Sequence, residues 1–374
     1  MDKILGLTIG EPFDLKSWSG SSFNFFSSLR SNNKLLDVFN VDLNKRQKFL
    51  YAIPHLSFNR TKLRQKYLIH PLTFRKRSAI ATSIAREYED ADVIMQIGAM
   101  FKVNSDSKPI VAYCDGNLAI SKDSNRSFTE FVPQHILKKA FENEKSVYEK
   151  CSLIFTFSEW LRKSMVRDFE LPENKVFAIG AGPNISLTEA LEEKKGYDQK
   201  TILFIGKDFY RKGGDTVIKA FYIASKEIKD IKLIIAGTNP IHGVEARNIE
   251  FTGYIDKNTN EGRKKIIDLY KRASVFVMPS VFEPFGIVFL EAMLFKLPCV
   301  GSSICAMPEI IDEDNTGFLI NPGDAEALAE KLIILLKDEA MLKKMGENGF
   351  ERVMTQYTWD NVVSKIDILL NKIA

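Results

Sequence analysis

Short apolar strand-like runs alternate with longer helical stretches along most of this 374-residue chain. The runs at residues 153–157 and 201–205 are rich in Val, Ile, Leu and Phe, and each is followed by a stretch with helical character. Parallel strands need a crossover between them, which is usually a helix. The repeated order of strand, helix, strand therefore predicts an α/β fold with doubly wound parallel sheets.

The length of the chain exceeds what one hydrophobic core usually organises, so we expect two domains. A charged stretch without a strand pattern, residues 187–200, separates two alternating series of strands and helices. The predicted parts are an N-terminal Rossmann-like domain (1–185), a linker (186–200), a second α/β domain (201–355) and a C-terminal helical segment (356–374).

Composition excludes several classes of protein. The four cysteines are scattered without a Cys-x-x-Cys pair, and the four histidines are equally dispersed, which argues against a zinc site. A net charge of +4 is too small to indicate nucleic-acid binding. The N-terminus does not have the pattern of a signal peptide, and no apolar run reaches the roughly 20 residues of a membrane-spanning helix. We expect a cytoplasmic protein in a reducing compartment.

The stretch from Met278 to Gly301 carries the strongest functional signal. It contains the end of an apolar run, a Pro-Ser break, a short loop and a helix that is predicted to start near Gly286. Glu283 lies in the loop and Glu291 in the helix. A glycine between them lets a ligand approach the backbone, and the free N–H groups at the helix start favour an anion. A phosphorylated sugar fits this pattern; the alternative is a loop acid and a solvated helix acid.

The pattern Glu-x-Phe-Gly-x-x-x-x-Glu, formed by Glu283, Phe285, Gly286 and Glu291, resembles that of the retaining nucleotide-sugar glycosyltransferases of family 4. The resemblance implies the GT-B fold, in which two Rossmann-like domains face each other across a cleft. It further implies that Glu283 holds hydroxyls of the donor sugar and Glu291 those of the ribose. Backbone amides after Phe285, at Gly286 and Ile287, would contact the sugar and the diphosphate. The terminal helical segment would cross back to the first domain, which is the acceptor side.

A glycine and paired cations follow the first strand of the second domain. Gly206, Lys207, Arg211 and Lys212 precede a helix, as a phosphate site requires. The family pattern is Gly-Arg, four residues, then Lys-Gly, so that Lys212 matches the family lysine. Lys207 departs from the pattern because lysine lacks the bidentate fork of arginine, and Arg211 is a candidate to compensate. The alternative is a solvated basic turn.

Two further candidates lie in the N-terminal half. The turn Trp18-Ser-Gly-Ser-Ser between the first strand and the first helix is a weak phosphate-binding signal, and such turns also simply connect elements. The resemblance adds that a glycine loop here closes over the donor phosphates, which makes Gly20 a candidate. Asp115 follows a strand at its carboxyl end, where α/β sheets bind ligands. It is a candidate for polarising an acceptor hydroxyl, or else it forms a turn with Gly116 and Asn117.

Residues 60–77 have the most uneven charge in the chain. Basic and apolar side chains are interleaved there without an acid. The preferred interpretation is a solvated face. The other is contact with an anionic membrane or an acidic acceptor, to which each basic residue contributes roughly 1 kcal/mol at a membrane surface. The basic residues are Arg60, Lys62, Arg64, Lys66, Arg75, Lys76 and Arg77.

No metal is expected at the site. The Asp-x-Asp string at 90–92 lies between a predicted helix and strand, and that at 312–314 precedes a turn, so both indicate exposed connector acids. Lysines and a helix end can stabilise a leaving diphosphate instead. Apart from the donor substrate, we expect no cofactor.

Together with the resemblance, these patterns predict a metal-independent hexosyltransferase that moves a sugar from a nucleoside diphosphate to an acceptor hydroxyl. That the transfer retains the configuration of the sugar is implied by the resemblance alone. The acceptor could be a glycan, a lipid-linked compound or a small molecule. Alternatives are a sugar phosphorylase of the same fold and a non-catalytic nucleotide-binding partner subunit. A Rossmann oxidoreductase is disfavoured, because no Gly-x-Gly-x-x-Gly follows the first strand of either half.

Overall fold

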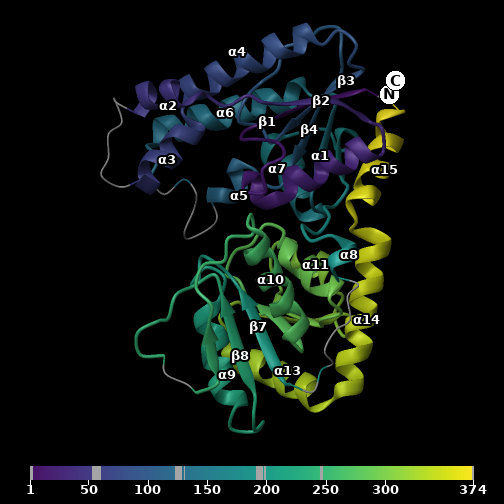
Figure 1. Cartoon of the computed structure of the whole chain (residues 1–374). Coiled ribbons are helices and arrows are strands. Elements are labelled where there is room, and N and C mark those ends of the chain that lie inside the picture. The colour runs from purple at the N-terminus through teal and green to yellow at the C-terminus, as the bar shows by residue number, and fades with distance from the viewer. Residues whose placement is uncertain are drawn as a thin grey trace. The chain divides into compact units, whose positions relative to one another are not determined.

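The computed structural model describes residues 3–52, 60–122, 129, 131–190, 197, 199–244 and 247–372. The chain forms two compact units, one made of Met1–Gly180 with Val362–Ala374 and the other of Ala181–Asn361. Each unit is built on one six-stranded sheet with helices packed beside it (Figure 1). All recorded strand pairs are parallel. The predicted α/β class with two doubly wound sheets is confirmed.

The sheet of the first unit has the order β2-β1-β3-β4-β5-β6. Several of its strands are buried along their whole length, which explains why they appear in the sequence as continuous apolar runs. The strands are β1 (Ile4–Thr8), β2 (Leu35–Asn40), β3 (Val93–Ile97), β4 (Ile110–Cys114), β5 (Leu153–Thr156) and β6 (Val176–Ala178). The α-helices of residues 1–180 are α1 (Ser21–Ser31), α2 (Lys45–Ala52), α3 (Arg60–Ile69), α4 (Pro71–Glu87), α5 (Leu118–Lys122), α6 (Gln134–Lys150) and α7 (Glu159–Phe169).

The sheet of the second unit has the order β12-β11-β10-β7-β8-β9. Its strands are β7 (Thr201–Ile205), β8 (Lys232–Ala236), β9 (Ile249–Phe251), β10 (Val275–Met278), β11 (Cys299–Ser302) and β12 (Gly317–Ile320). Its helices are α8 (Leu187–Ala190), α9 (Gly214–Ala224), α10 (Asn260–Arg272), α11 (Ile287–Leu294), α12 (Met307–Ile310), α13 (Ala325–Lys337) and α14 (Glu339–Gln356). The last helix, α15 (Trp359–Leu370), starts in this unit and ends in the first.

Strand β12 was not among the predicted strands. Its sequence is short and follows an acidic turn, so the apolar run gave little signal. Gly317 is required at its start, because a Cβ there would lie 1.9 Å from the carbonyl oxygen of Cys299 on β11. This close approach of two backbones is visible only in the folded chain.

The stretch predicted as a linker, residues 186–200, begins as the short helix α8. Its Glu189 accepts a hydrogen bond of 2.7 Å from Nη2 of Arg263, and a second from the same guanidinium. The hydrogen bonds from Arg263 lower the pKa of Glu189 to about 2. The start of this stretch is therefore packed onto the second unit, while residues 191–196 and 198 lie outside the described part of the chain.

The basic stretch forms helices α3 and α4, which were not predicted except for the end of α4. Pro71 stands in the first turn of α4, where its missing N–H costs nothing, and His70 caps the helix by accepting from the N–H of Leu72. The interpretation of the whole stretch as a solvated or membrane-binding face is wrong for Arg77. Its side chain is fully buried, whereas Arg75 and Lys76 are exposed.

Arg77 can be buried because its guanidinium forms an ion pair with Asp42. Its Nε lies 2.8 Å and its Nη2 2.7 Å from Oδ1 of Asp42, and its Nη1 donates to the carbonyl of Leu68 at 2.8 Å. Tyr67 donates to the same Oδ1 at 2.9 Å. Burial raises the pKa of Asp42, but the charge of Arg77 and the surrounding hydrogen bonds lower it overall. The pair connects helix α4 to the segment that follows β2.

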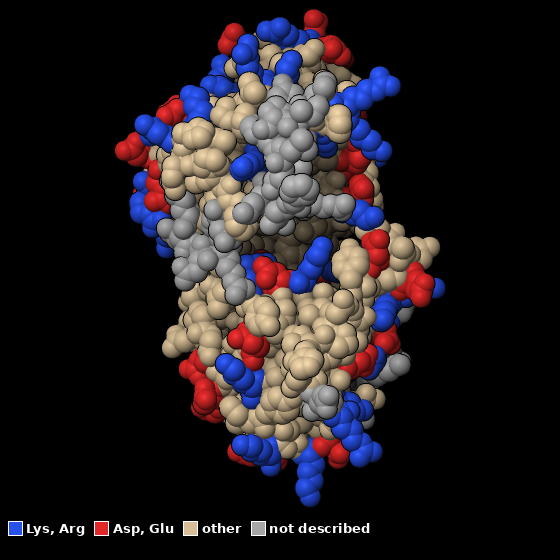
Figure 2. Space-filling view, turned by 90° about the vertical axis from the view of Figure 1, so that its left-hand side faces the viewer, with Lys and Arg blue, Asp and Glu red and all other residues tan. Residues whose placement is uncertain are grey.

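The described residues include no helix that is long and apolar enough to cross a membrane. Apart from the residues drawn in grey, Figure 2 shows acidic and basic side chains interspersed over the visible face of each unit.

Among the described residues of the first unit, the buried carboxyl group of Glu144 has polar neighbours instead of a cation. Glu144 in α6 is 7% exposed. Its Oε1 accepts from the hydroxyl of Tyr148 at 2.7 Å, and its Oε2 accepts from the N–H of Leu118, at the start of α5, at 3.0 Å. Burial raises the pKa of Glu144 to about 7, because these two hydrogen bonds offset only part of the cost of desolvating the charge.

We expect Glu144 to make the stability of the first unit depend on pH. Between its ordinary value of 4.5 and about 7, the folded state binds more protons than the unfolded state, so the free energy of unfolding falls as the pH rises. The fall should be about 3 kcal/mol and complete just above pH 7. Denaturant titrations at pH 4.5 and 7.5 on wild type and Glu144→Gln would measure it. Equal pH dependence in both proteins would contradict the expectation.

Candidate functional site

The order of the second sheet defines where a ligand can bind. Strands β7 and β10 are neighbours, but the chain continues from β7 to β8 on one side and from β10 to β11 on the other. The loops that follow the two strands therefore run in opposite directions. Such a place is a topological switch point, where open α/β sheets bind their ligands. Gly206 to Lys212 follow β7, and Glu283 follows β10. The fold thus brings the two predicted motifs together.

Two glycines allow the turn after β7 to pack closely. Gly213 precedes α9 with a positive φ of 77°, and a Cβ there would lie 2.0 Å from the carbonyl oxygen of Pro279, just after β10. A Cβ at Gly206 would lie 2.8 Å from Cδ of Lys212. The stem of Lys212 therefore passes over Gly206, which directs its ammonium toward the loop after β10.

Lys212, Arg211 and Glu283 form a compact charged cluster. Oε2 of Glu283 lies 3.2 Å from Nζ of Lys212 and 3.3 Å from Nη1 of Arg211. The three side chains are only 17%, 22% and 16% exposed, in the order Lys212, Arg211, Glu283. Burial raises the pKa of Glu283, but the charges and hydrogen bonds of the two cations outweigh it and lower the pKa overall. The carboxylate is therefore ionised, and these three side chains together carry one excess positive charge.

Arg211 also holds the backbone of the loop after β10. Its Nη1 donates to the carbonyl of Phe282 at 2.6 Å, its Nε donates to Asp208 at 3.0 Å, and its own carbonyl accepts from the N–H of Val281. These contacts give Arg211 a positioning role that the sequence did not suggest. Its predicted compensation for Lys207 stays a prediction. Lys207 itself is exposed, with its Nζ 5.4 Å from the ring centroid of Tyr254.

The start of helix α11 has the predicted form. Gly286 caps the helix with a φ of 89°, and the first helical residue is Ile287. Phe285 is buried, so its side chain anchors the loop. A Cβ at Gly286 would lie 3.0 Å from Phe289 and 3.5 Å from Cγ of Glu283. Contact of the amides with an anion stays a prediction.

Glu291 is 1% exposed, so the alternative of a solvated helix acid is wrong. Its Oε2 accepts from the hydroxyl of Tyr270 at 2.9 Å and lies 3.2 Å from Nζ of Lys257. Neither partner was predicted, because Tyr270 in α10 and Lys257 in the preceding loop belong to no recognisable motif. Contact of Glu291 with a ribose stays a prediction, and it would involve the other oxygen or a shift of Lys257.

Cys305 is a neighbour of Glu283 that the sequence did not indicate. It lies in the loop after β11 with a φ of 52°, close enough to Glu283 for the carboxylate charge to act on its thiol. Burial raises the pKa of the thiol, and the charge of Glu283 raises it further. The thiol is therefore protonated at neutral pH.

The two candidates in the first unit have different surroundings. Gly20 is buried and caps α1 with a φ of 95°, while the hydroxyl of Ser22 donates to the carbonyl of Pro12. The serine thus stabilises the turn itself. Asp115 is exposed after β4 and accepts from the indole N–H of Trp18 at 2.6 Å. The roles of Gly20 in phosphate binding and of Asp115 in acceptor binding stay predictions.

Within the described part of the chain, no group of three or more His, Cys, Asp or Glu side chains is arranged to hold a metal ion. In the first Asp-x-Asp string, Asp92 accepts from the N–H of Lys3. In the second, Asp312 accepts from the side chain of Asn315. Asp92 therefore joins the starts of β1 and β3, and Asp312 stabilises its own turn.

Part of this chain is similar to known proteins. Residues 188–352 match the family model described as "Glycosyl transferases group 1". The chain is 33% identical over 250 residues to an uncharacterized glycosyltransferase of Methanocaldococcus jannaschii, a match that covers 61% of this chain and 62% of the relative. It is 26% identical over 236 residues to the capsular polysaccharide biosynthesis glycosyltransferase CapM of Staphylococcus aureus, covering 58% and 61%. The matches thus span about 60% of the length of these two curated relatives.

Solved structures extend the likeness to the whole fold. The sucrose-phosphate synthase of Thermosynechococcus elongatus has a TM-score of 0.70 at 18% identity, covering 100% of this chain and 99% of that one. The HepE protein of Anabaena, in complex with UDP-glucose, has a TM-score of 0.64 at 15% identity, covering 99% of both chains.

The fold is therefore that of the GT-B glycosyltransferases, with two Rossmann-like domains. Residues 188–352, which lie in the second unit, are similar to the group 1 glycosyltransferases.

Proposed function

We propose that this protein is a retaining glycosyltransferase that transfers a hexose from a nucleoside diphosphate sugar to an acceptor hydroxyl. The observation that carries the proposal is the cluster of Lys212, Arg211 and Glu283 at the switch point of the second sheet. A cationic pair opposite an ionised carboxylate provides separate groups for the diphosphate and for sugar hydroxyls. The Anabaena structure with UDP-glucose supports a donor of this class.

Stabilisation of the leaving group carries most of the proposed catalysis. Charge grows on the diphosphate as the glycosidic bond breaks, and pre-organised cations lower the energy of that state. Lys212 opposes this charge directly, with Lys207 and the amides at the start of α11 as further donors. Glu283 remains ionised and accepts hydrogen bonds from the sugar. Asp115 is the proposed contact for the acceptor hydroxyl.

Donor class and stereochemistry are tested together. Calorimetric titration with UDP, GDP, ADP and TDP identifies the nucleotide, and proton NMR of the first product formed from the matching α-linked donor shows the anomeric configuration. An α-linked product supports retention, and a β-linked product rules it out. Turnover that depends on inorganic phosphate in place of an alcohol acceptor would identify a phosphorylase instead.

The proposed reaction needs no metal, because side-chain cations and helix amides oppose the diphosphate charge. We expect turnover of the donor to survive exhaustive treatment with EDTA with little loss. A rate abolished by the chelator and restored by Mg²⁺ or Mn²⁺ would overturn this part of the proposal.

We further propose peripheral contact with anionic lipid through the exposed part of helix α4. Arg75 and Lys76 are exposed, and Leu72 on the preceding turn is 51% exposed. Sedimentation with anionic vesicles should fall when Arg75 and Lys76 are both replaced by Ser. Equal pelleting of this variant and wild type would leave α4 as a solvated helix.

A further inference from the structure

Trp18 has a backbone conformation that residues with a side chain seldom adopt. Its φ is 49° and its ψ is 38°, and Ser19 after it has a φ of 58° and a ψ of 25°, so both residues are left-handed. This region is unfavourable for any residue that has a Cβ. Such strain persists only where other contacts compensate for it, and it occurs often at functional sites. The contacts of Trp18 therefore indicate which function the turn serves.

The side chain of Trp18 connects the loop after β1 to the loop after β4. Strand β3 lies between these two strands, and all three are parallel, so their carboxyl ends lie at one edge of the sheet. The indole N–H of Trp18 donates to Oδ2 of Asp115 at 2.6 Å. An indole has no other polar group. Its one hydrogen bond is thus made to the side chain that is the proposed contact for the acceptor hydroxyl.

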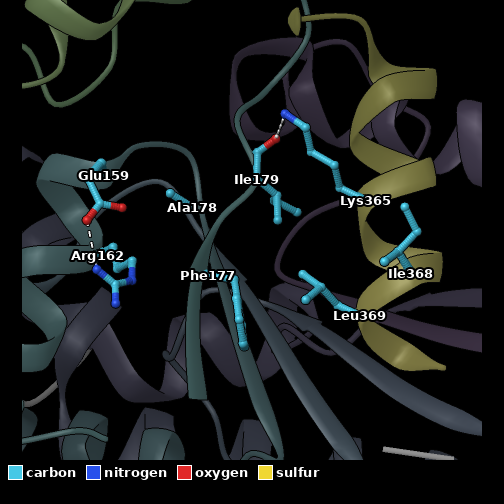
Figure 3. A pocket seen from close by; sticks show the side chains of 8 residues that line it. All are labelled: Glu159, Arg162, Phe177, Ala178, Ile179, Lys365, Ile368 and Leu369. Atoms are coloured by element: carbon cyan, nitrogen blue, oxygen red, sulfur yellow. Dashed lines mark hydrogen bonds and ion pairs between the residues drawn. The ribbon is translucent and has the colours of Figure 1, made fainter. Parts of the chain in front are cut away.

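Two aromatic side chains hold the indole ring in place. The ring centroids lie 4.9 Å from Phe157, after β5, and 5.7 Å from Tyr113, on β4, and the second pair is edge-to-face. Tyr113 is fully buried, and its hydroxyl donates to the carbonyl of Gly180 at 2.6 Å. The carbonyl of the preceding Ile179 accepts from Lys365 on α15 at 3.0 Å (Figure 3). The indole therefore packs on a tyrosine that is itself anchored.

Other groups fix the backbone that carries Asp115. Asn117 is 6% exposed, and its Nδ2 donates to the hydroxyl of Ser164 at 3.0 Å. The N–H of Leu118 donates to the carboxyl group of Glu144 at 3.0 Å. These contacts determine where the Cα of Asp115 lies. The direction of its carboxylate depends on the side-chain rotamer, which the hydrogen bond from the indole constrains.

We propose that Trp18 is a positioning residue that orients the carboxylate of Asp115 toward the acceptor hydroxyl. This role rests on the proposed function, in which Asp115 contacts that hydroxyl. Each carboxylate oxygen has two lone pairs, so the bond from the indole is compatible with one from the acceptor. Misplacing a group beside the reacting atoms by about 1 Å can lower a rate on the order of a hundredfold. The left-handed turn thus places an N–H beside a carboxylate two strands away.

The contact can be measured without any ligand. The chain contains three tryptophans, so labelling with ¹⁵N-tryptophan gives three indole N–H signals in an NMR spectrum. The signal that is absent from Trp18→Phe belongs to Trp18. A hydrogen bond to a carboxylate moves an indole proton downfield, so we expect this signal to move upfield in Asp115→Ala while the other two stay in place. A Trp18 signal at the same position in Asp115→Ala and wild type would overturn the proposal.

The effect on catalysis is measured as a double-mutant cycle. The probes are the α-D-glucose esters of UDP, GDP, ADP and TDP with water as the acceptor, and the maximal rate of nucleoside diphosphate release is recorded. Trp18→Phe keeps an aromatic ring but loses the N–H, and should lower this rate roughly tenfold to a hundredfold. In the Asp115→Ala background, the same substitution should change the rate less than about twofold, because the group it orients is gone.

Affinity for the nucleoside diphosphate separates positioning from general damage. Calorimetric titration should give the same affinity for Trp18→Phe and wild type, because Lys212 and Glu283 belong to the second unit and Trp18 to the first. A purely structural role of Trp18 would lower the rate by the same factor with and without the carboxylate of Asp115. That result, or an unchanged rate in Trp18→Phe, would overturn the proposal.

Tyr88→Phe is the matched control. It also removes a hydrogen bond from an aromatic side chain to an aspartate, since the hydroxyl of Tyr88 donates to Asp37 at 2.9 Å, but Tyr88 lies before β3 and not after a strand. Its rate and its affinity should equal those of wild type. If wild type released none of the four nucleoside diphosphates while Asp115→Ala still moved the Trp18 signal, the proposed function would be wrong and the contact between the two side chains would stand.

Discussion

Replacing Lys212 by Met should weaken binding of the nucleoside diphosphate by roughly 1.5–3 kcal/mol, the usual contribution of a charged hydrogen bond. Methionine keeps an unbranched stem that can pass over Gly206, but it removes the ammonium. Turnover should fall further, by a factor on the order of 100 to 1,000, because the charge opposed by Lys212 grows in the transition state. Paired titration and rate measurements on the variant would separate the two effects.

Replacing Glu283 by Ala should lower turnover without weakening the binding of the nucleoside diphosphate. Without the carboxylate, the ammonium of Lys212 loses its anionic partner and remains available to the diphosphate, so the affinity for the diphosphate should equal or exceed that of wild type. Turnover should nevertheless collapse, because the sugar is no longer held in its reactive position. Lys229→Met, at an exposed position of the same unit, is the control and should leave both measurements unchanged.

Two results would contradict this division of roles. If Lys212→Met bound the diphosphate as wild type does, the cation that binds the diphosphate would be another residue. If Glu283→Ala lost as much diphosphate affinity as Lys212→Met, then the carboxylate would act by holding the cations in place and not by holding the sugar.

Replacing Arg77 by Met should destabilise the first unit by roughly 3–5 kcal/mol, because the buried carboxylate of Asp42 would lose its fully buried partner. Lys48, which lies 2.6 Å from the other oxygen of Asp42 and is 44% exposed, would compensate only in part. The free energy of unfolding is measured by denaturant titration. Unfolding is monitored through a spectroscopic signal that reports on the first unit.

The double variant with Arg75 and Lys76 replaced by Ser is the matched control, since it removes two charges from the exposed positions of the same helix. Its stability should stay within about 0.5 kcal/mol of wild type, as is usual for surface substitutions. If the Arg77→Met variant were equally stable, the buried pair would contribute no net stability to the unit.

The local patterns of the sequence were sufficient for the type of fold. Parallel strands buried on both faces, such as β3 and β4, must be continuous apolar runs, and their alternation with helices leaves few possible architectures. Capping is equally local: Ser158 caps α7 by accepting from the N–H of Leu161. Lys212 and Glu283 were identified because each lies beside a glycine or proline in a turn after a strand, and Gly286 is itself the glycine of such a turn.

Tertiary structure alone decided which of these groups interact. The strand order places β7 beside β10, and this brings Lys212 to Glu283 across 71 residues of chain. It also gives Glu291 its partners Tyr270 and Lys257, and Arg77 its partner Asp42. Charge composition cannot distinguish Arg77 from the exposed Arg75, because both are arginines on one helix and differ only in the face they occupy. Partners distant in sequence are selected by packing, and packing depends on the whole chain at once.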